Sequence, residues 1–258
     1  MIGGYLLLLA PFFICFSGVV AACKEEPPGI PVKDYILFWQ DEFDGKKLNL
    51  AKWGYLLGKR RDAYNVTETV FLDGKGFLHL QAKKKGDSVL AAIISTEHLF
   101  ETRYGYFECR AMLTKALGIW PAFWLLSGKS AADNGTPEAN GVEIDIFEYF
   151  ANSKRDTVSH NLHWGGYGPT HQETGFVYAP LQKTTSGFHT FGLEWTDTSY
   201  RAFVDGHQTV AGNKLISKVQ QFILLSVECA AAAAGPLEVN ALPDDFIVDY
   251  VRVYKKKG

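Results

Sequence analysis

The sequence predicts an all-β protein built as a sandwich of two antiparallel sheets. About a dozen short segments rich in β-branched and aromatic residues are separated by turn signals, a pattern typical of that class. No long stretch has helical periodicity, and no repeat of fixed period appears. The 258 residues suffice for one large domain with a substantial core, and the 25 glycines suit frequent turns.

The expected strands follow one another along the chain. The first lies near residues 35–43 and ends at a turn of Asp44 and Gly45, and the sequence DGKG at 73–76 is a hairpin signal. The other expected strands are 66–72, 77–82, 91–96, 104–113, 119–126, 141–149, 159–164, 189–195, 200–204, 222–228 and 246–254. Two loops stand out: 127–140 leads directly into the acidic strand at 141–149, and the alanine run 230–234 has no evident chemical role.

The net charge narrows the possible partners, and the cysteines bear on disulfides and zinc sites. The formal net charge of −2 gives no nucleic-acid footprint, so we expect a neutral partner and no nucleic acid. Within the predicted domain only Cys109 and Cys229 occur. They could form a disulfide in an oxidising compartment, although two buried free thiols are the expectation for a β core. No clustered His and Cys spacing suggests zinc.

The N-terminal segment is read as an export signal. Residues 2–22 carry no charge and form an apolar stretch, and the following Val-Ala-Ala-Cys sequence resembles a bacterial lipobox with Cys23 as the lipidated residue. We therefore expect a signal peptide at 1–22, a Pro-rich tether at 23–34 and a catalytic domain at 35–258. The expected location is the cell envelope, lipid-anchored at the outer surface or in the periplasm. An uncleaved membrane anchor and plain secretion are the alternatives, and a monomer is expected.

Three acidic residues in the strand 141–149 are the main candidates for chemistry. Alternate side chains of a strand share a face, so Glu143 and Asp145 point the same way while Glu148 has the opposite parity. One extra residue, a β-bulge near Ile146 and Phe147, would return Glu148 to the face of the other two. The hypothesis of a shared acidic face therefore requires a bulge.

Such a cluster suits the cleavage of glycosidic bonds. Carboxylates on one face repel one another, so at least one should hold a proton near neutral pH. A charged carboxylate can then act as the nucleophile while a protonated one acts as the general acid, which is the two-carboxylate chemistry of glycosidases. Retaining glycosidases need their two catalytic carboxyl groups about 5–5.5 Å apart, and inverting glycosidases need them about 6.5–9.5 Å apart. The spacing in the sequence permits either mechanism. A solvent-facing acidic strand and a calcium site are the alternatives.

At this point the chain resembles glycoside hydrolase family 16 from about residue 35 to residue 254. Besides the E-x-D-x-x-E run, the resemblance rests on WQDEFDG at 39–45, YGYFECR at 104–110, GIWPAFWLL at 118–126, FHTFGLEW at 188–195 and VDYVRVY at 248–254. It implies a concanavalin-like β-jelly-roll of two curved antiparallel sheets with a substrate cleft. It also implies a retaining mechanism with Glu143 as nucleophile, Glu148 as general acid/base and Asp145 tuning the charge of Glu143. The five-residue offset resembles the bulged branch of laminarinases, agarases and carrageenases, and no catalytic cofactor is implied.

Further residues are candidates for binding the sugar chain. Trp120 is the best candidate for stacking on a sugar ring and Trp164 the next. His163 could bind substrate, steady Glu148 or serve only the structure. We expect Asn65 and its neighbour Tyr64 to line the cleft because of their position in the sequence. The remaining tryptophans Trp39, Trp53, Trp124 and Trp195 are expected in the core, and Glu108 and Arg110 as a structural pair.

The resemblance also implies a structural calcium ion. The matching positions are Glu42, the carbonyl of Gly74 and Asp249, whose oxygen atoms are of the kind that calcium prefers. The alternative is that Glu42 and Asp249 bond only to the protein itself at the sheet edge.

Two departures bear on the substrate. The Trp that laminarinases usually carry just before the first catalytic Glu is absent, and the alanine run replaces a Gly-rich segment. Both segments should border the cleft. We expect an endo-hydrolase of β-1,3(4)-glucan, with a β-galactan as the competing substrate and a glycan-binding protein without turnover as the alternative from another class. Because Glu143, Asp145 and Glu148 are all present, the enzyme is favoured.

Overall fold

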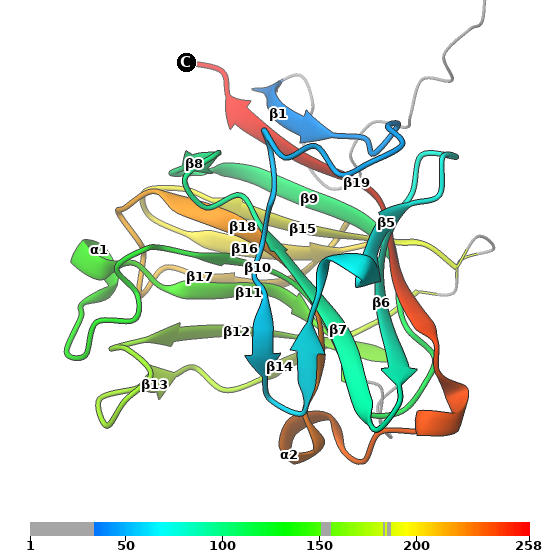
Figure 1. The fold of residues 1–258 in the computed structure, drawn as a ribbon. Helices are drawn as coiled ribbons and strands as arrows, with labels where there is room; N and C mark the ends of the chain where they lie inside the picture. Colours follow the sequence, from blue (N-terminus) through cyan, green and yellow to red (C-terminus); the bar gives the residue numbers. More distant parts are fainter. Residues whose placement is uncertain (1–33, 151–155, 183, 185–186) are drawn as a thin grey trace, which may run out of the picture.

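Two antiparallel sheets pack face to face in the protein, as predicted (Figure 1). The computed structural model describes residues 34–150, 156–182, 184 and 187–258. The predicted signal peptide, Cys23 and all of the tether except residue 34 lie outside the described residues.

The first sheet has β19 (Asp244–Lys256) at its centre. This strand pairs with β9 on one side and with β1 and β6 on the other, and the sheet continues from β9 through β15 and β16 to β17. Short β5 extends it beyond β6. The bounds are β1 (Tyr35–Asp41), β5 (Val70–Leu72), β6 (Leu78–Lys85), β9 (Gly105–Met112), β15 (His189–Trp195), β16 (Tyr200–Val204) and β17 (His207–Gly212).

The second sheet carries the acidic strand β11 (Glu143–Glu148) between β10 and β12. Beyond β10 lie β18 and then β7, and beyond β12 lie the short edge strands β13 and β14. Small strands β2 and β8 complete it. The bounds are β2 (Gly54–Tyr55), β7 (Ser88–Ser95), β8 (Glu101–Thr102), β10 (Ile119–Leu126), β12 (Thr157–Trp164), β13 (Gln172–Glu173), β14 (Val177–Pro180) and β18 (Gln221–Cys229).

One hairpin links the two sheets. Strand β6 pairs with β19 through its first part and with β7 through residues 83–85, so the β6–β7 hairpin passes from one sheet to the other. Beside it, β3 (Gly58–Arg60) and β4 (Ala63–Asn65) form a small hairpin, and β4 runs parallel to β7. The turn of this hairpin, residues 60–62, reaches the functional site described below.

The helices are short. They are α1 (Pro137–Asn140), α2 (Ala231–Ala234) and the 3₁₀ turns η2 (Thr67–Thr69) and η3 (Val239–Ala241). The side chain of Thr136 accepts a hydrogen bond from the Ala139 N–H at the start of α1, and Gly141 ends the helix at φ +86°. In the described part of the chain, no helix has the length and apolar character needed to cross a membrane.

The core lies between the sheets, where alternate residues of facing strands meet. Phe147 of β11 packs on Phe191 and Phe246 of the opposite sheet, with ring centroids 3.9 and 5.8 Å apart. Fully burying a side chain of this size stabilises the fold by about 1.5–3 kcal/mol. Trp53 and Trp195 are fully buried, which confirms their predicted place in the core.

The two cysteines of the domain are free thiols, as expected. Cys109 lies in β9 of the first sheet and Cys229 in β18 of the second, and both are buried. Each therefore fills core space as a small apolar side chain.

The predicted pair of Glu108 and Arg110 is wrong. Glu108 accepts hydrogen bonds from the hydroxyls of Tyr106, at 3.0 Å, and Tyr250, at 2.9 Å. Arg110 instead contacts Asp249 at 2.7 Å. Strand β19 supplies one partner to each residue, Tyr250 to Glu108 and Asp249 to Arg110, and Tyr106 of β9 itself supplies the second partner of Glu108.

Candidate active site

A β-bulge in β11 brings the three acidic residues to one face. Asp145 pairs with Asn161 and Glu148 pairs with Ser159, so three steps along β11 match two steps along β12. The register against β10 shifts at the same place. The extra residue restores the parity of Glu148, and Glu143, Asp145 and Glu148 line the same pocket. The predicted bulge is confirmed.

The pocket lies on the outer face of the second sheet, away from the core. Its other walls come from the β3–β4 hairpin, β10, β12 and the segment after it, β18 and α2. The remaining lining residues are Arg60, Arg61, Trp120, Ala122, Trp124, Phe150, His163, Tyr167, His171, Phe176, Ser226, Glu228 and Ala233. Ala233 belongs to the alanine run, which borders the pocket as expected.

Glu148 has the properties of a general acid. It is 4% exposed, and burial, together with the negative charge of Asp145, raises the pKa of its carboxyl well above the usual range. Its Oε2 is buried and has no hydrogen-bond partner among the described residues. The raised pKa favours the protonated form of Glu148, which is the form that can donate a proton into the pocket.

Glu143 is placed differently. Its side chain is half-buried, and its Oε2 accepts a hydrogen bond from the hydroxyl of Tyr167. Nε2 of His163 lies 3.9 Å from its other oxygen. The hydroxyl donor at one oxygen and the imidazole near the other orient the Glu143 carboxyl group within the pocket.

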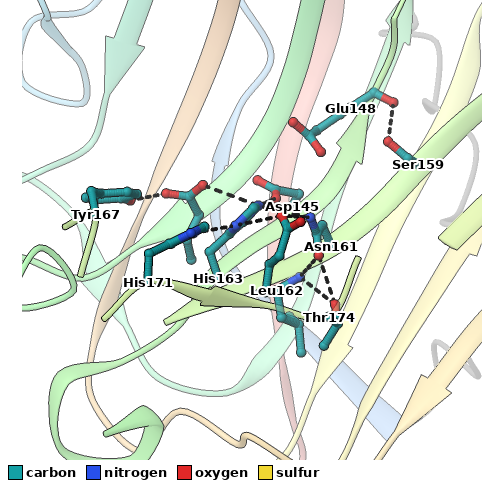
Figure 2. Close-up of polar contacts among 11 residues, drawn as sticks. Asp145, Glu148, Ser159, Asn161, Leu162, His163, Tyr167, His171 and Thr174 are labelled. Atoms are coloured by element: carbon teal, nitrogen blue, oxygen red, sulfur yellow. Dashed lines mark hydrogen bonds and ion pairs between the residues drawn. The ribbon is translucent and has the colours of Figure 1, made fainter. Parts of the chain in front are cut away.

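Asp145 lies between the two glutamates and contacts His163. Burial, followed by the negative charge of Glu143, raises the pKa of Asp145 well above its usual range. Its Oδ2 is 3.2 Å from His163 Nε2 (Figure 2). His163, one of the predicted site residues, therefore contacts the nucleophile and its neighbour. A protonated Asp145 lowers the repulsion that Glu143 would otherwise feel.

A second layer of polar groups orients His163. Nδ1 of His163 lies 3.0 Å from Nε2 of His171, and Nδ2 of Asn161 is 3.1 Å from Nε2 of His163 (Figure 2). The Asn161 amide is held in turn by Glu173 and Thr174, at 3.1 and 2.9 Å. Because these partners fix the imidazole ring, they also fix the carboxylates that it touches.

The segment after β12 carries Tyr167 and His171, which the sequence analysis missed. It packs closely on the loop 127–140: a Cβ atom at Gly166, where φ is +82°, would lie 2.6 Å from Asp133 Oδ1. A Cβ atom at Gly168 would meet the same atom at 2.7 Å. Glycine is therefore required for this approach. The GGYGP sequence at 165–169, directly after Trp164, was the available signal.

Two arginines in the pocket were also missed. Nε of Arg60 donates to Glu228 Oε1 at 2.6 Å, and Nε of Arg61 donates to Oε2 of the same carboxylate. The guanidinium of Arg61 also lies over the Trp120 ring, 4.6 Å from its centroid. The contacts tie the β3–β4 hairpin to β18 across one end of the pocket. The signal was a Lys-Arg-Arg sequence in a predicted loop.

The predicted tryptophans have mixed outcomes. Trp120 lines the pocket, although Arg61 covers one face of its ring. Trp124 is 8% exposed, but it also lines the pocket and donates from Nε1 to Ser226 Oγ at 3.2 Å. Trp124 is buried as expected for a core residue. It lies on the other face of the sheet, however, because β10 presents its side chain to the cleft and not to the core between the sheets. Trp39 is half-buried and packs on the core.

Trp164 and Asn65 do not line the catalytic pocket. Trp164 lines a neighbouring pocket with the segment 134–137, since it follows His163 on β12 and so has the opposite parity. Asn65 is buried in β4, opposite Gly58 and Ala91. Tyr64 is exposed, with the Lys59 ammonium 6.0 Å from its ring centroid.

The residues predicted to bind calcium do not fit a calcium ion in this arrangement. Glu42 forms two contacts with Arg252, at 2.8 and 3.0 Å, and Asp249 contacts Arg110 at 2.7 Å. Each carboxylate charge is thus already offset by a guanidinium, and Gly74 occupies a turn at φ +74°. The calcium site stays a prediction. Within the described ranges, the acidic and histidine side chains close enough to share an ion are Glu143, Asp145 and His163, the catalytic candidates themselves.

Comparisons with known proteins show the family to which the chain belongs. The family described as "Glycosyl hydrolases family 16" matches residues 59–222. The chain is 27% identical to the glucan endo-1,3-beta-glucosidase A1 of Niallia circulans, over 86% of this chain and 38% of that protein. It is 28% identical to a beta-glucanase of Rhodothermus marinus, over 85% of each chain. It is 26% identical to the keratan-sulfate endo-1,4-beta-galactosidase of Sphingobacterium multivorum, over 88% of this chain and 56% of that protein.

A solved structure shows the same architecture. The laminarinase catalytic domain from Thermotoga maritima superposes with a TM-score of 0.73 at 27% identity, covering 87% of this chain and all of that one. The jelly-roll sandwich inferred from the sequence is thereby confirmed. The chain spans less than two fifths of the length of the Niallia relative but most of the Rhodothermus one.

Proposed function

Because the chain belongs to glycosyl hydrolase family 16, we propose that it is a retaining endo-hydrolase that cleaves internal linkages of a β-1,3(4)-glucan. The observation that carries this proposal is the bulge in β11, which places Glu148 in one pocket with Glu143 and Asp145. The glucanase names of the two relatives support the choice of a glucan.

The proposed reaction has two displacements. Glu143 attacks the anomeric carbon while Glu148 gives its proton to the leaving glycosidic oxygen, which forms a glycosyl ester on Glu143. Glu148, now a carboxylate, then removes a proton from water. The water oxygen bonds to the anomeric carbon, and Glu143 leaves as a carboxylate. The raised pKa of Glu148 supports its role as the acid of the first step.

A β-galactan is the second candidate substrate. The similarity to a keratan-sulfate endo-galactosidase supports it. Both candidates use the same catalytic residues, so the reaction type does not depend on the choice.

A polysaccharide panel tests the proposal. Purified protein is incubated with laminarin, mixed-linkage glucan, agarose, porphyran, carrageenan and mucin-type glycans, and the products are sized. Internal cleavage of laminarin or mixed-linkage glucan is expected, with Glu143→Gln abolishing turnover while polysaccharide binding persists. Cleavage of galactans alone would show that the substrate is a β-galactan and not the proposed glucan. Binding without any turnover would leave a glycan-binding protein, and a near-normal rate in Glu143→Gln would remove Glu143 as nucleophile.

We also propose that the protein is anchored to the cell envelope through a lipid on Cys23, after removal of residues 1–22. The apolar stretch and the lipobox-like sequence support this. Cys23→Ala should move the protein from the membrane to the soluble fraction of the host cell. Unchanged membrane fractionation of the variant would count against lipidation.

A further inference from the structure

A line of aromatic rings leads out of the catalytic pocket. Trp120 contacts Phe150, Phe150 contacts Phe176, and Phe176 contacts Tyr178, with ring centroids 5.0, 5.3 and 6.0 Å apart. Phe150 is buried, at 8% exposed, whereas the two outer rings of Phe176 and Tyr178 are 46% and 44% exposed. The two outer rings belong to β14 and the residue before it, at the edge of the second sheet.

The strand register places the outer end of this line on the same face as the catalytic acid. Glu148 pairs with Ser159 of β12, and Ser159 pairs with Tyr178 of β14. Cross-strand partners point to the same face of a sheet, and two strand spacings amount to roughly 10 Å. In the strand register, the residue between Glu148 and Tyr178 is Ser159, which has a small side chain. The cleft face can therefore extend from the acid to Tyr178.

Alternation along β14 supports this orientation. Val177, between the two aromatic residues, lines a different pocket together with Leu193 and Tyr200 at the edge of the sandwich. Phe176 itself lines the catalytic pocket. Since neighbouring residues of a strand point to opposite faces, Phe176 and Tyr178 share the cleft face.

Two half-exposed aromatic rings beside a catalytic pocket suit one kind of ligand. A phenyl ring exposed to water gains free energy when an apolar surface covers it, and the C–H face of a pyranose ring is such a surface. An anionic ligand finds no hydrogen-bond donor in Phe176, which has no polar side-chain atom. The continuity with the pocket favours the chain of sugar units that enters it.

We propose that Phe176 and Tyr178 form an outer binding platform for a neutral pyranose ring of the polysaccharide, beyond the residues that contact the cleaved bond. This inference rests on the proposed glycoside hydrolase function and adds a determinant of chain length to it. The platform holds long chains across β12 and contributes little to short ones, which end before they reach Tyr178.

The test uses Tyr178→Ala and the double variant Phe176→Ala/Tyr178→Ala, each also in the Glu143→Gln background so that binding is measured without turnover. Polysaccharide affinity should fall roughly tenfold for Tyr178→Ala, as for other interface aromatics. The loss should be larger for polysaccharide than for a trisaccharide. Phe38→Ala removes a ring of β1 that is 55% exposed in the other sheet, and it should bind as the parent does. Melting temperatures verify folding.

The outcomes separate the two proposals. If the parent Glu143→Gln protein binds no polysaccharide and the wild type cleaves none, the proposed function fails and the platform with it. If the parent binds and cleaves, but both variants keep its affinity at every chain length, the platform is overturned while the function stands. A loss of affinity that is equal for trisaccharide and polysaccharide also overturns the platform, because the residues then act within the catalytic pocket.

Discussion

The hydroxyl of Tyr167 donates a hydrogen bond to Oε2 of Glu143 and so joins the segment after β12 to the candidate nucleophile. That segment is fixed from the other side, since Gly166 and Gly168 allow it to approach Asp133. Thr170 holds it as well, with its Oγ1 accepting from the Asn134 N–H at 2.9 Å. The nucleophile is therefore oriented by a loop contact as well as by its own strand.

Tyr167→Phe should lower kcat and KM together. In the second displacement Glu143 leaves as a carboxylate, and the hydroxyl stabilises the charge that returns to it. A hydrogen bond to a charged group is worth about 1.5–3 kcal/mol, so deglycosylation should slow about 10- to 100-fold. The glycosyl-enzyme then accumulates, which lowers the apparent KM. Steady-state kinetics and mass spectrometry of quenched enzyme measure both effects.

The matched control for that variant is Tyr64→Phe, which removes the hydroxyl of an exposed tyrosine that does not line the pocket. It should leave both kinetic constants unchanged. A Tyr167→Phe enzyme with a raised KM and no trapped intermediate would assign Tyr167 to substrate binding instead.

Activity should be lost at high pH through Glu148. Burial and Asp145 raise the pKa of Glu148, so the acid form persists to higher pH than in a free glutamate, and the rate falls as pH rises through that raised pKa. Glu148→Gln should lower kcat on polysaccharide by about 10²–10⁴-fold and remove this basic limb. An aryl glycoside with a nitrophenol leaving group should lose much less in its first step, because it needs no proton. Equal losses on both substrates would contradict the acid role.

Chelation should leave the melting temperature unchanged. The carboxylates of Glu42 and Asp249 are each held by an arginine, Arg252 and Arg110, and need no cation to offset their charge. Unfolding followed by calorimetry with EDTA and then with added calcium provides the measurement. A fall of several degrees in EDTA that calcium reverses would show that a calcium ion displaces these arginine contacts.

Local patterns predicted the catalytic strand because strand parity is a property of neighbouring residues. The positions of Glu143, Asp145 and Glu148 alone required a bulge, and the structure has it. Tyr167 and Arg61 reach the pocket through loops, whose path depends on contacts far away in sequence, such as Asp133 with Gly166. No periodicity reports such contacts.

The face of a buried strand was harder to assign than its existence. Trp124 is as buried as a core residue, yet it faces the cleft, because both faces of the second sheet are largely covered there. The arginine partners of the predicted calcium ligands were missed for a related reason. Matching positions give the residue types, but Arg110 and Arg252 on neighbouring strands decide which partners Asp249 and Glu42 take.

Glu108 should make the stability of the protein depend on pH. The side chain is fully buried in β9, and burial raises the pKa of its carboxyl to about 7, although the hydroxyls of Tyr250 and Tyr106 oppose the rise. The unfolded chain has a pKa of about 4.5 at this position. Because the folded value is the higher one, the folded state favours the proton. The stability from protonation is complete below pH 4.5 and is lost as the pH rises through 7.

Glu108→Gln removes that dependence, since an amide has no proton to lose and still accepts a hydrogen bond from a tyrosine hydroxyl. Relative to wild type, the variant should gain unfolding free energy between pH 4.5 and pH 8, by on the order of 3 kcal/mol for a shift of this size. Urea unfolding at several pH values measures the difference in unfolding free energy between the variant and wild type. The contributions of Asp145 and Glu148 to the pH dependence cancel in this difference, because both proteins contain these residues. Glu97→Gln, at a partly exposed glutamate, serves as control and should show no such trend. A difference between Glu108→Gln and wild type that stays constant with pH would mean that Glu108 keeps its usual pKa in the folded protein, with Tyr106 and Tyr250 stabilising a buried carboxylate.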